Sequence, residues 1–243
     1  MIVGLDCIDS RFRFENFVRD ESNSDAYKAA QMVAKGSMGG MPLVIHSGTG
    51  LGKTHLLHAI GNEALRRNQE IRVALFSTEW FCCEFILAGR EGVVENFRAK
   101  VSGHYDLYLV DDLTYIDGKQ LTQTELFLAL KKHSKNGCGI ILASCLPIDA
   151  MRDWQDEFKV WLRYGVGITE PTVEGRHAFL KECLTEKGLP ADDRMIESLH
   201  LLSGTSFREL EGAVIRLQAG AALAGVKPTV DYARKVLKQC YAV

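Results

Sequence analysis

The sequence predicts an α/β fold, with a parallel sheet flanked by helices, followed by a small all-helical domain. Short apolar runs alternate with helical patterns along the first two thirds of the chain, which is typical of parallel sheets. A glycine-rich segment stands between the first apolar run and the helix that follows it. Beyond about residue 171 only helical patterns remain. We therefore expect an α/β domain over residues 1–171 and a helical domain over residues 172–243.

The elements of the first domain follow from the spacing of apolar residues. A helix is predicted over residues 22–35, where Ser22 and Asn23 precede a row of alanines on one side. The apolar run 42–45 is bounded by glycines and is typical of a buried parallel strand. The same patterns predict further strands over 72–76, 107–110 and 139–143, and further helices over 53–67, 79–88, 93–100 and 121–133.

The second domain is predicted to contain four helices, over residues 174–187, 192–202, 208–223 and 230–239. Each begins near a Thr, Asp or Ser, whose side chains cap helix N-termini by accepting a backbone hydrogen bond. The boundary between the domains is placed near Pro171, where the strand signals have stopped.

Composition and charge restrict the class of protein. Of the 243 residues, 47% are hydrophobic and 25% charged, which is ordinary for a soluble globular protein. The formal net charge of -2 means that any contact with nucleic acid must come from a local basic surface. No stretch reaches the 18 or more apolar residues of a membrane span, and the N-terminus does not resemble a leader peptide. We therefore expect a cytoplasmic protein without a membrane span.

The glycine-rich segment has the composition of a phosphate-binding loop. It consists of Gly48, Thr49, Gly50, Leu51, Gly52, Lys53 and Thr54. Glycines allow backbone N–H groups to surround phosphate oxygens, and the following helix directs its positive dipole end at them. Lys53 is then expected to reach the β- and γ-phosphates, and the Thr54 hydroxyl to hold Mg²⁺. Ser47 stands where the strict pattern has glycine, so we expect a slightly reshaped loop.

An acidic pair follows a later apolar strand. Asp111 and Asp112 end the run 107–110, downstream of the phosphate loop. Asp111 is expected to orient Mg²⁺ through water, and Asp112 to polarise the water that attacks the γ-phosphate. Together the two motifs predict a site for ATP or ADP with Mg²⁺.

Several segments, in order, resemble the AAA+ ATPase core of the bacterial replication initiator DnaA. The run GLGKTHLLHAIGN at residues 50–62 is similar almost letter for letter. Further similar segments are FENFV at 14–18, SN at 22–23, STE at 77–79, DD at 111–112, GK at 118–119 and FRELEGA at 207–213. The similarity extends from about residue 12 to residue 238. It implies a five-stranded parallel sheet and a helical lid.

The resemblance also implies roles for individual residues. Phe17, Val18, Asn23 and His55 belong to the nucleotide-binding set, the first three in the segment beside the adenine. Arg208 is expected to contact the γ-phosphate within its own subunit. Arg163 matches the arginine finger, which is offered to the ATP of a neighbouring subunit. Catalytic roles therefore fall on Asp112, Arg163 and Arg208, and self-association is expected to occur through ATP-bridged interfaces.

The resemblance extends to contacts with DNA. Ile86 and Lys119 fall on positions that the family uses for single-stranded DNA. Leu121 stands where the family has a basic residue, so we expect weaker binding to single strands.

Two other departures bear on function. Cys145 and Leu146 stand where the family commonly has Asp and Arg, so slow hydrolysis is expected. DnaA proteins continue into a module that reads duplex DNA, whereas this sequence ends at Val243. Three functions remain open: an ATP switch that assembles on origin DNA, a regulator that lends Arg163 to a full-length initiator, and a loader of the replicative helicase.

Overall fold

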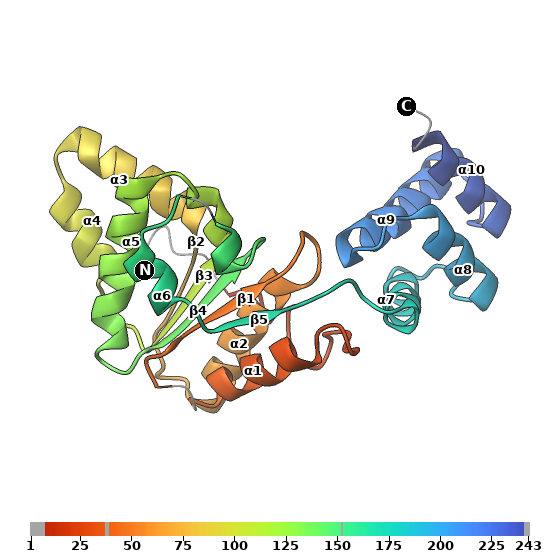
Figure 1. Cartoon of the computed structure of the whole chain (residues 1–243). Coiled ribbons are helices and arrows are strands. Elements are labelled where there is room, and N and C mark those ends of the chain that lie inside the picture. Colours follow the sequence, from red (N-terminus) through yellow and green to blue (C-terminus); the bar gives the residue numbers. More distant parts are fainter. Residues whose placement is uncertain (1–7, 37–38, 152, 241–243) are drawn as a thin grey trace. The chain divides into compact units, whose positions relative to one another are not determined.

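The computed structural model describes residues 8–36, 39–151 and 153–240. The chain divides into two compact units (Figure 1). Unit 1 contains residues 25–47 and 52–168, together with the N-terminal segment up to Phe17. Unit 2 contains residues 18–24, 48–51 and the chain from Thr169 onward.

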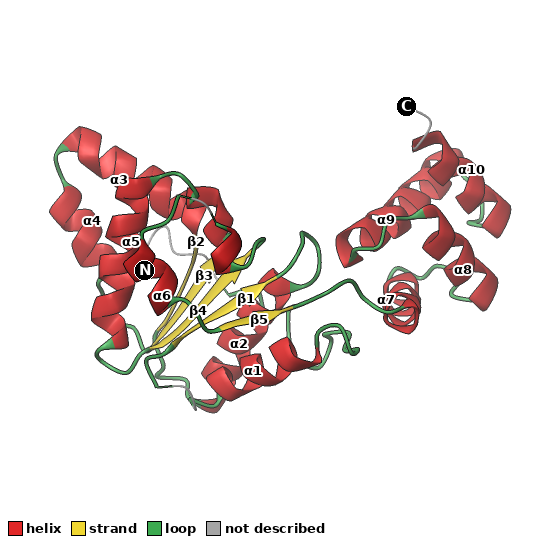
Figure 2. Cartoon of the chain, in the orientation of Figure 1, coloured by secondary structure: helices red, strands yellow, loops and turns green. Residues whose placement is uncertain are grey.

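A five-stranded parallel sheet forms the centre of unit 1, which confirms the predicted fold class (Figure 2). The strand order is β2-β3-β4-β1-β5. The strands are β1 (Pro42–His46), β2 (Val73–Ser77), β3 (Leu107–Asp111), β4 (Gly139–Ser144) and β5 (Gly165–Gly167). Their carboxyl ends share one edge of the sheet, which is where ligands bind in open α/β folds.

Helices cover both faces of this sheet (Figure 2). They are α1 (Ser24–Ala34), α2 (Lys53–Arg67), α3 (Thr78–Glu91), α4 (Val94–Val101), α5 (Gln120–Ser134) and α6 (Asp156–Trp161), with short 3₁₀ helices η1 (Leu113–Ile116) and η2 (Ile148–Ala150). Alternate strand residues such as Phe76, Tyr108 and Val110 pack into one core with α3 to α6. Leu109, between two of them, instead lies against Gly61 of α2. The pleat therefore divides the buried side chains between two faces.

The periodicity in the sequence located four strands but neither β5 nor α6. Strand β5 has only three residues, two of them glycine, so it lacks the apolar run that marks a buried strand. It forms because its backbone pairs with β1, with Val44 opposite Gly165. The His46 imidazole lies against both glycines, and a Cβ at Gly167 would be 3.0 Å from its ring. This strand therefore forms through backbone pairing with β1 and the space that its glycines leave for His46, and not through the β-propensity of its side chains.

Unit 2 contains helices α7 (Val173–Glu186), α8 (Asp193–Leu202), α9 (Phe207–Ala224) and α10 (Val230–Cys240). They enclose a core of their own, which includes Leu180, Leu199, Leu210, Leu217 and Leu237. The caps inferred from the sequence are present: the side chains of Thr172, Asp192 and Ser206 accept hydrogen bonds from the first turns of α7, α8 and α9. Within the described residues, we find no helix with the length and apolar character needed to cross a membrane.

Candidate nucleotide site

The predicted phosphate loop connects β1 to α2. Gly50 and Gly52 have φ angles of 78° and 95°, in the left-handed region that other residues avoid. A Cβ at Gly52 would lie 2.9 Å from the Phe17 ring, so glycine is also required for space. Ser47, at the departure from the strict pattern, is buried and donates its backbone N–H to Ser144 at the end of β4. The loop thus starts from a fixed position on the sheet.

Lys53 is buried, with 7% of its surface exposed. Its ammonium donates to the Ser47 carbonyl oxygen at 2.9 Å and to the Ser47 hydroxyl at 3.2 Å. Burial lowers the pKa of Lys53, and the nearby Cys145, Asp111 and Asp112 act in the opposite direction. The predicted phosphate-loop lysine and acidic pair are therefore close together, so Lys53 presents a poorly solvated positive charge to an anion.

Thr54 and Asp111 form the candidate magnesium site. The Thr54 hydroxyl donates to the Asp111 carboxylate, with 2.7 Å between the oxygens. Thr54 lies in the first turn of α2 and Asp111 ends β3, so two rigid elements bring the pair together. Mg²⁺ prefers oxygen ligands and usually takes only one or two from the protein, with phosphates and water supplying the rest. The hydroxyl and carboxylate present here fit that requirement.

Asp112 has an unusual backbone. Its φ and ψ are 52° and 55°, a left-handed conformation that costs a non-glycine residue about 1–3 kcal/mol. The Thr78 hydroxyl, fully buried at the start of α3, donates to the Asp112 carbonyl at 2.5 Å. Burial, followed by repulsion from Asp111, raises the pKa of Asp112. A raised pKa makes this carboxylate a better proton acceptor.

Replacing Thr78 with valine keeps the shape of the side chain but removes the hydroxyl. We expect Thr78→Val to slow ATP hydrolysis about fivefold, since loss of one hydrogen bond costs roughly 1 kcal/mol and releases Asp112 from its strained conformation. The affinity for ATP stays unchanged. Single-turnover hydrolysis and equilibrium ATP binding measure the two effects, with Thr78→Ser as the matched variant that retains the hydroxyl. An equal loss in Thr78→Ser contradicts this role.

Cys145, which stands where the family commonly has Asp, lies beside Lys53. It follows β4, and its backbone N–H donates to the Thr114 hydroxyl at 2.8 Å. Its thiol is one of the groups that oppose the lowering of the Lys53 pKa by burial. The sequence indicated no role for Thr114, and Thr78 stood only within the similar segment STE at 77–79. Each stands next to a recognised element, Thr114 just after the acidic pair and Thr78 just after β2, and that adjacency was the available signal.

The residues predicted near the adenine fall in both units. In unit 1, the rings of Phe17 and His55 are perpendicular with centroids 5.1 Å apart, and a ring nitrogen of His55 lies 2.8 Å from the Arg13 carbonyl. Burial lowers the pKa of His55, which favours its neutral form. In unit 2, Asn23 is 1% exposed and its amide donates to the Val18 carbonyl at 3.0 Å.

The two predicted arginines have different environments. The Arg163 side chain is exposed, with its guanidinium 5.0 Å from the Tyr164 ring centroid and 3.0 Å from the Tyr164 hydroxyl. Arg208 lies in the first turn of α9 in unit 2, and its backbone N–H lies 3.4 Å from the carbonyl of Gly50 in the predicted phosphate loop. A Cβ at Gly50 would be 2.8 Å from the Arg208 Cβ, so this glycine allows the lid helix to approach the loop.

The positions predicted to contact DNA lie at the surface of unit 1. Ile86 on α3 is 48% exposed, and Leu121 at the start of α5 is 80% exposed. Lys119 contacts the Tyr115 carbonyl and lies 4.1 Å from the Tyr115 ring centroid. Its ammonium is thus folded onto η1, and it must leave this position to contact a phosphate.

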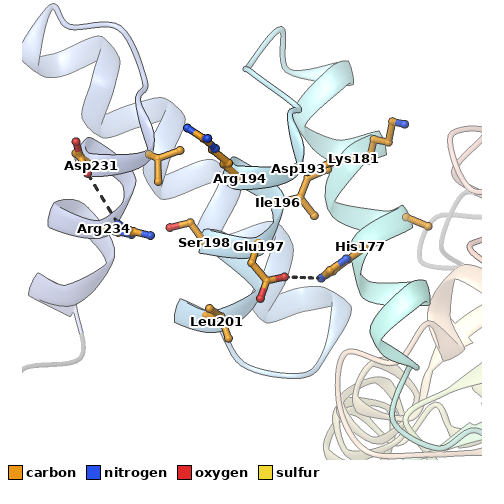
Figure 3. A pocket seen from close by; sticks show the side chains of 12 residues that line it. His177, Lys181, Asp193, Arg194, Ile196, Glu197, Ser198, Leu201, Asp231 and Arg234 are labelled. Atoms are coloured by element: carbon orange, nitrogen blue, oxygen red, sulfur yellow. Dashed lines mark ion pairs between the residues drawn. The ribbon is translucent and has the colours of Figure 1, made fainter.

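A pocket of about 920 Å³ lies among the lid helices (Figure 3). An ion pair from His177 to Glu197 joins α7 to α8 in its lining, and a second, from Arg234 to Asp231, lies within α10. The acidic and basic side chains of its lining balance: three lysines or arginines face three carboxylates. The lining residues are His177, Ala178, Lys181, Asp193, Arg194, Ile196, Glu197, Ser198, Leu201, Val230, Asp231 and Arg234, and none of them is a predicted site residue.

Comparisons with known proteins identify the family of the chain. The family model described as the bacterial DnaA ATPase domain matches residues 8–169. The chromosomal replication initiator protein DnaA of Thermus thermophilus is 36% identical over 238 residues, covering 97% of this chain and 54% of that protein. The chain thus spans about half the length of the curated relatives that it matches.

Solved structures give the same result. Domain III of DnaA from Thermotoga maritima matches with a TM-score of 0.89 and 30% identity, covering 98% of this chain and all of that one. A DnaA replication initiator bound to AMPPCP and single-stranded DNA matches with a TM-score of 0.78 and 28% identity, covering 90% of this chain and 70% of that one. The chain therefore belongs to the family of bacterial DnaA ATPase domains and is an ATPase of the AAA+ fold.

Proposed function

We propose that this chain binds ATP with Mg²⁺ and acts as a nucleotide switch for assembly in the initiation of chromosomal replication. The observation that carries the proposal is the group of Lys53, Thr54 and Asp111 at the carboxyl edge of the sheet, with Thr54 and Asp111 2.7 Å apart. This group stands in a chain of the DnaA ATPase family. The division into an ATP-binding domain over residues 1–171 and a lid over 172–243 is part of the proposal.

Each residue has a role in this scheme. Lys53 binds the β- and γ-phosphates, and Thr54 and Asp111 hold Mg²⁺, which would neutralise phosphate charge. Asp112 orients the attacking water and accepts its proton, for which its raised pKa is favourable. Arg208 binds the γ-phosphate from the lid of the same subunit.

Assembly requires a group that reaches another subunit. Arg163 is exposed, and in its own chain its guanidinium contacts Tyr164. A planar guanidinium that never loses its charge suits the γ-phosphate of a neighbouring ATP. The relative solved with AMPPCP and single-stranded DNA supports the further step, in which the assembled chains bind an origin single strand through Ile86 and Lys119.

Size-exclusion chromatography with ATP, with ADP and without nucleotide tests the proposal. The switch predicts a high-mass species with ATP alone. A chain that remains monomeric in ATP contradicts it. If that monomer stimulates hydrolysis by a full-length initiator through Arg163, the regulatory function applies instead, and binding to the replicative helicase identifies a loader.

Single-strand binding depends on Lys119 in this proposal. We expect Lys119→Ala to weaken binding of a fluorescent oligonucleotide several-fold and to reduce the salt slope by about 0.7, since one phosphate contact is lost. Fluorescence anisotropy over a series of salt concentrations measures both quantities. Lys28→Ala is the matched control, because Lys28 is an exposed lysine on α1 that pairs with Asp25. An unchanged salt slope in Lys119→Ala removes this residue from the DNA interface.

The rate of hydrolysis depends on Cys145. A thiol beside Lys53 is a poor substitute for a carboxylate in polarising water or orienting the lysine. We expect Cys145→Asp to raise single-turnover ATP hydrolysis by about tenfold, with Cys83→Asp, an exposed site on α3, as the control. If Cys145→Asp hydrolyses ATP no faster than the parent chain, the residue at position 145 does not limit the rate.

A further inference from the structure

The segment that contains Val18 and Asn23 is attached to the lid through one carboxylate. Asp20 lies between these two residues in the sequence and faces the first turn of α7. Its Oδ2 accepts the backbone N–H of Thr172 at 2.8 Å and the Thr172 hydroxyl at 3.2 Å. Its Oδ1 accepts the backbone N–H of Ser22 at 2.9 Å and also the Ser22 hydroxyl. One side chain therefore joins two segments that are about 150 residues apart.

The same segment is closed by further hydrogen bonds. The Asp20 backbone N–H donates to the Asn23 side-chain oxygen at 3.1 Å, and the Asn23 amide donates to Val18. The Thr169 backbone N–H donates to the Ser22 carbonyl at 3.1 Å. Segment 18–23 and the chain that enters α7 thus belong to one network, and both lie in unit 2.

Gly175 provides the space that Asp20 needs. A Cβ at Gly175 would lie 2.3 Å from Asp20 Oδ2, a distance that no real contact tolerates. Gly175 is buried in the first turn of α7, where glycine is otherwise unfavourable by up to about 1 kcal/mol relative to alanine. The approach of the carboxylate explains why glycine stands at this position.

We propose that Asp20 is a positioning residue of the nucleotide site, which holds the adenine-facing segment 18–23 against the start of lid helix α7. This inference rests on the proposed function, because only there do Val18 and Asn23 contact adenine. Loss of the Asp20 contacts leaves the segment free to leave the base.

The effect of Asp20 is specific to the base. Asp20→Ala weakens ATP and ADP binding by the same factor, about tenfold, because adenine is common to both nucleotides and several hydrogen bonds that order the segment are lost. Binding of inorganic tripolyphosphate, which reaches only the phosphate loop, stays unchanged. A general loss of structure would instead weaken all three. Glu21→Ala, at the adjacent exposed carboxylate, is the matched control.

A double-mutant cycle with Gly175 completes the experiment. Gly175→Ala alone weakens ATP and ADP binding as Asp20→Ala does, because the new methyl group displaces the carboxylate. In the Asp20→Ala background it has no further effect on binding, since the oxygen that it would meet is gone. Isothermal titration of the four chains with ATP, ADP and tripolyphosphate supplies the measurements.

The outcomes separate the inference from the function on which it rests. If Lys53→Ala leaves ATP and tripolyphosphate binding unchanged, the proposed nucleotide site is wrong. If Lys53→Ala abolishes both but Asp20→Ala leaves ATP and ADP affinities at the level of Glu21→Ala, the positioning role of Asp20 is wrong. Additive effects of Asp20→Ala and Gly175→Ala also contradict it.

Discussion

Lys53→Ala is expected to lower the affinity for ATP by roughly 100-fold, because charge-assisted hydrogen bonds to phosphate contribute about 1.5–3 kcal/mol each. Without the ammonium, the negative charges of Asp111 and Asp112 also repel the triphosphate more strongly, because the positive charge that offsets them is gone. Burial already lowers the pKa of Lys53, so its ammonium is poorly solvated and gains more from a phosphate than an exposed lysine does. Retention of labelled ATP by the purified chain measures the effect.

The control for this experiment is Lys28→Ala, which removes a lysine of the same charge from the surface of α1. Circular dichroism confirms that both variants are folded. If Lys53→Ala retains ATP as well as Lys28→Ala does, the phosphate loop does not bind the triphosphate, and the roles of Thr54, Asp111 and Asp112 are lost with it.

The second large effect is expected for Arg163→Ala. ATP binding by the isolated chain is retained, since the guanidinium contacts Tyr164 and is exposed. ATP-dependent assembly is lost, and hydrolysis falls at least about tenfold. Arginine fingers contribute about 10³-fold or more to the rate where chemistry limits it. Because hydrolysis by the parent chain is itself expected to be slow, only part of this decrease can be measured. Size-exclusion chromatography and single-turnover hydrolysis measure the two losses.

A mixing experiment separates a finger that acts between subunits from one that acts within a chain. The Lys53→Ala chain is expected to bind no ATP but keeps Arg163. The Arg163→Ala chain binds ATP but lacks the guanidinium. Mixed together, they are expected to recover hydrolysis at the intact site of the Arg163→Ala chain. Arg66→Ala, which removes an exposed arginine on α2 that pairs with Glu63, serves as the control. If the mixture does not recover hydrolysis, Arg163 does not act on the ATP of a neighbouring subunit.

Local patterns were sufficient for most of the fold. Four of the five strands are buried apolar runs, and three lid helices carry caps of the expected Thr, Asp or Ser type, at Thr172, Asp192 and Ser206. The phosphate loop and the acidic pair could also be located, because glycines at positive φ and carboxylates at a strand end leave signals within a few residues. The resemblance to DnaA supplied the arginines and the positions near DNA, which no local pattern marks.

Contacts between distant segments could not be located in this way. Strand β5 depends on pairing with β1 and on space beside His46, and Thr78 supports Asp112 across 34 positions of sequence. In the sequence, nothing distinguishes Asp20 from other loop carboxylates. Its contacts with Thr172 and Gly175 exist only in the folded chain.

The sequence by itself determined the fold class and located the glycine-rich loop and the acidic pair, since each follows from the conformational preferences of neighbouring residues. Only the tertiary structure decided that Thr54 meets Asp111, that Lys53 is buried beside Cys145, and that Asp20 joins segment 18–23 to the first turn of α7. The physical reason is that hydrogen bonds and desolvation depend on distances of a few ångströms, and such distances between remote residues are set by the packing of the whole chain.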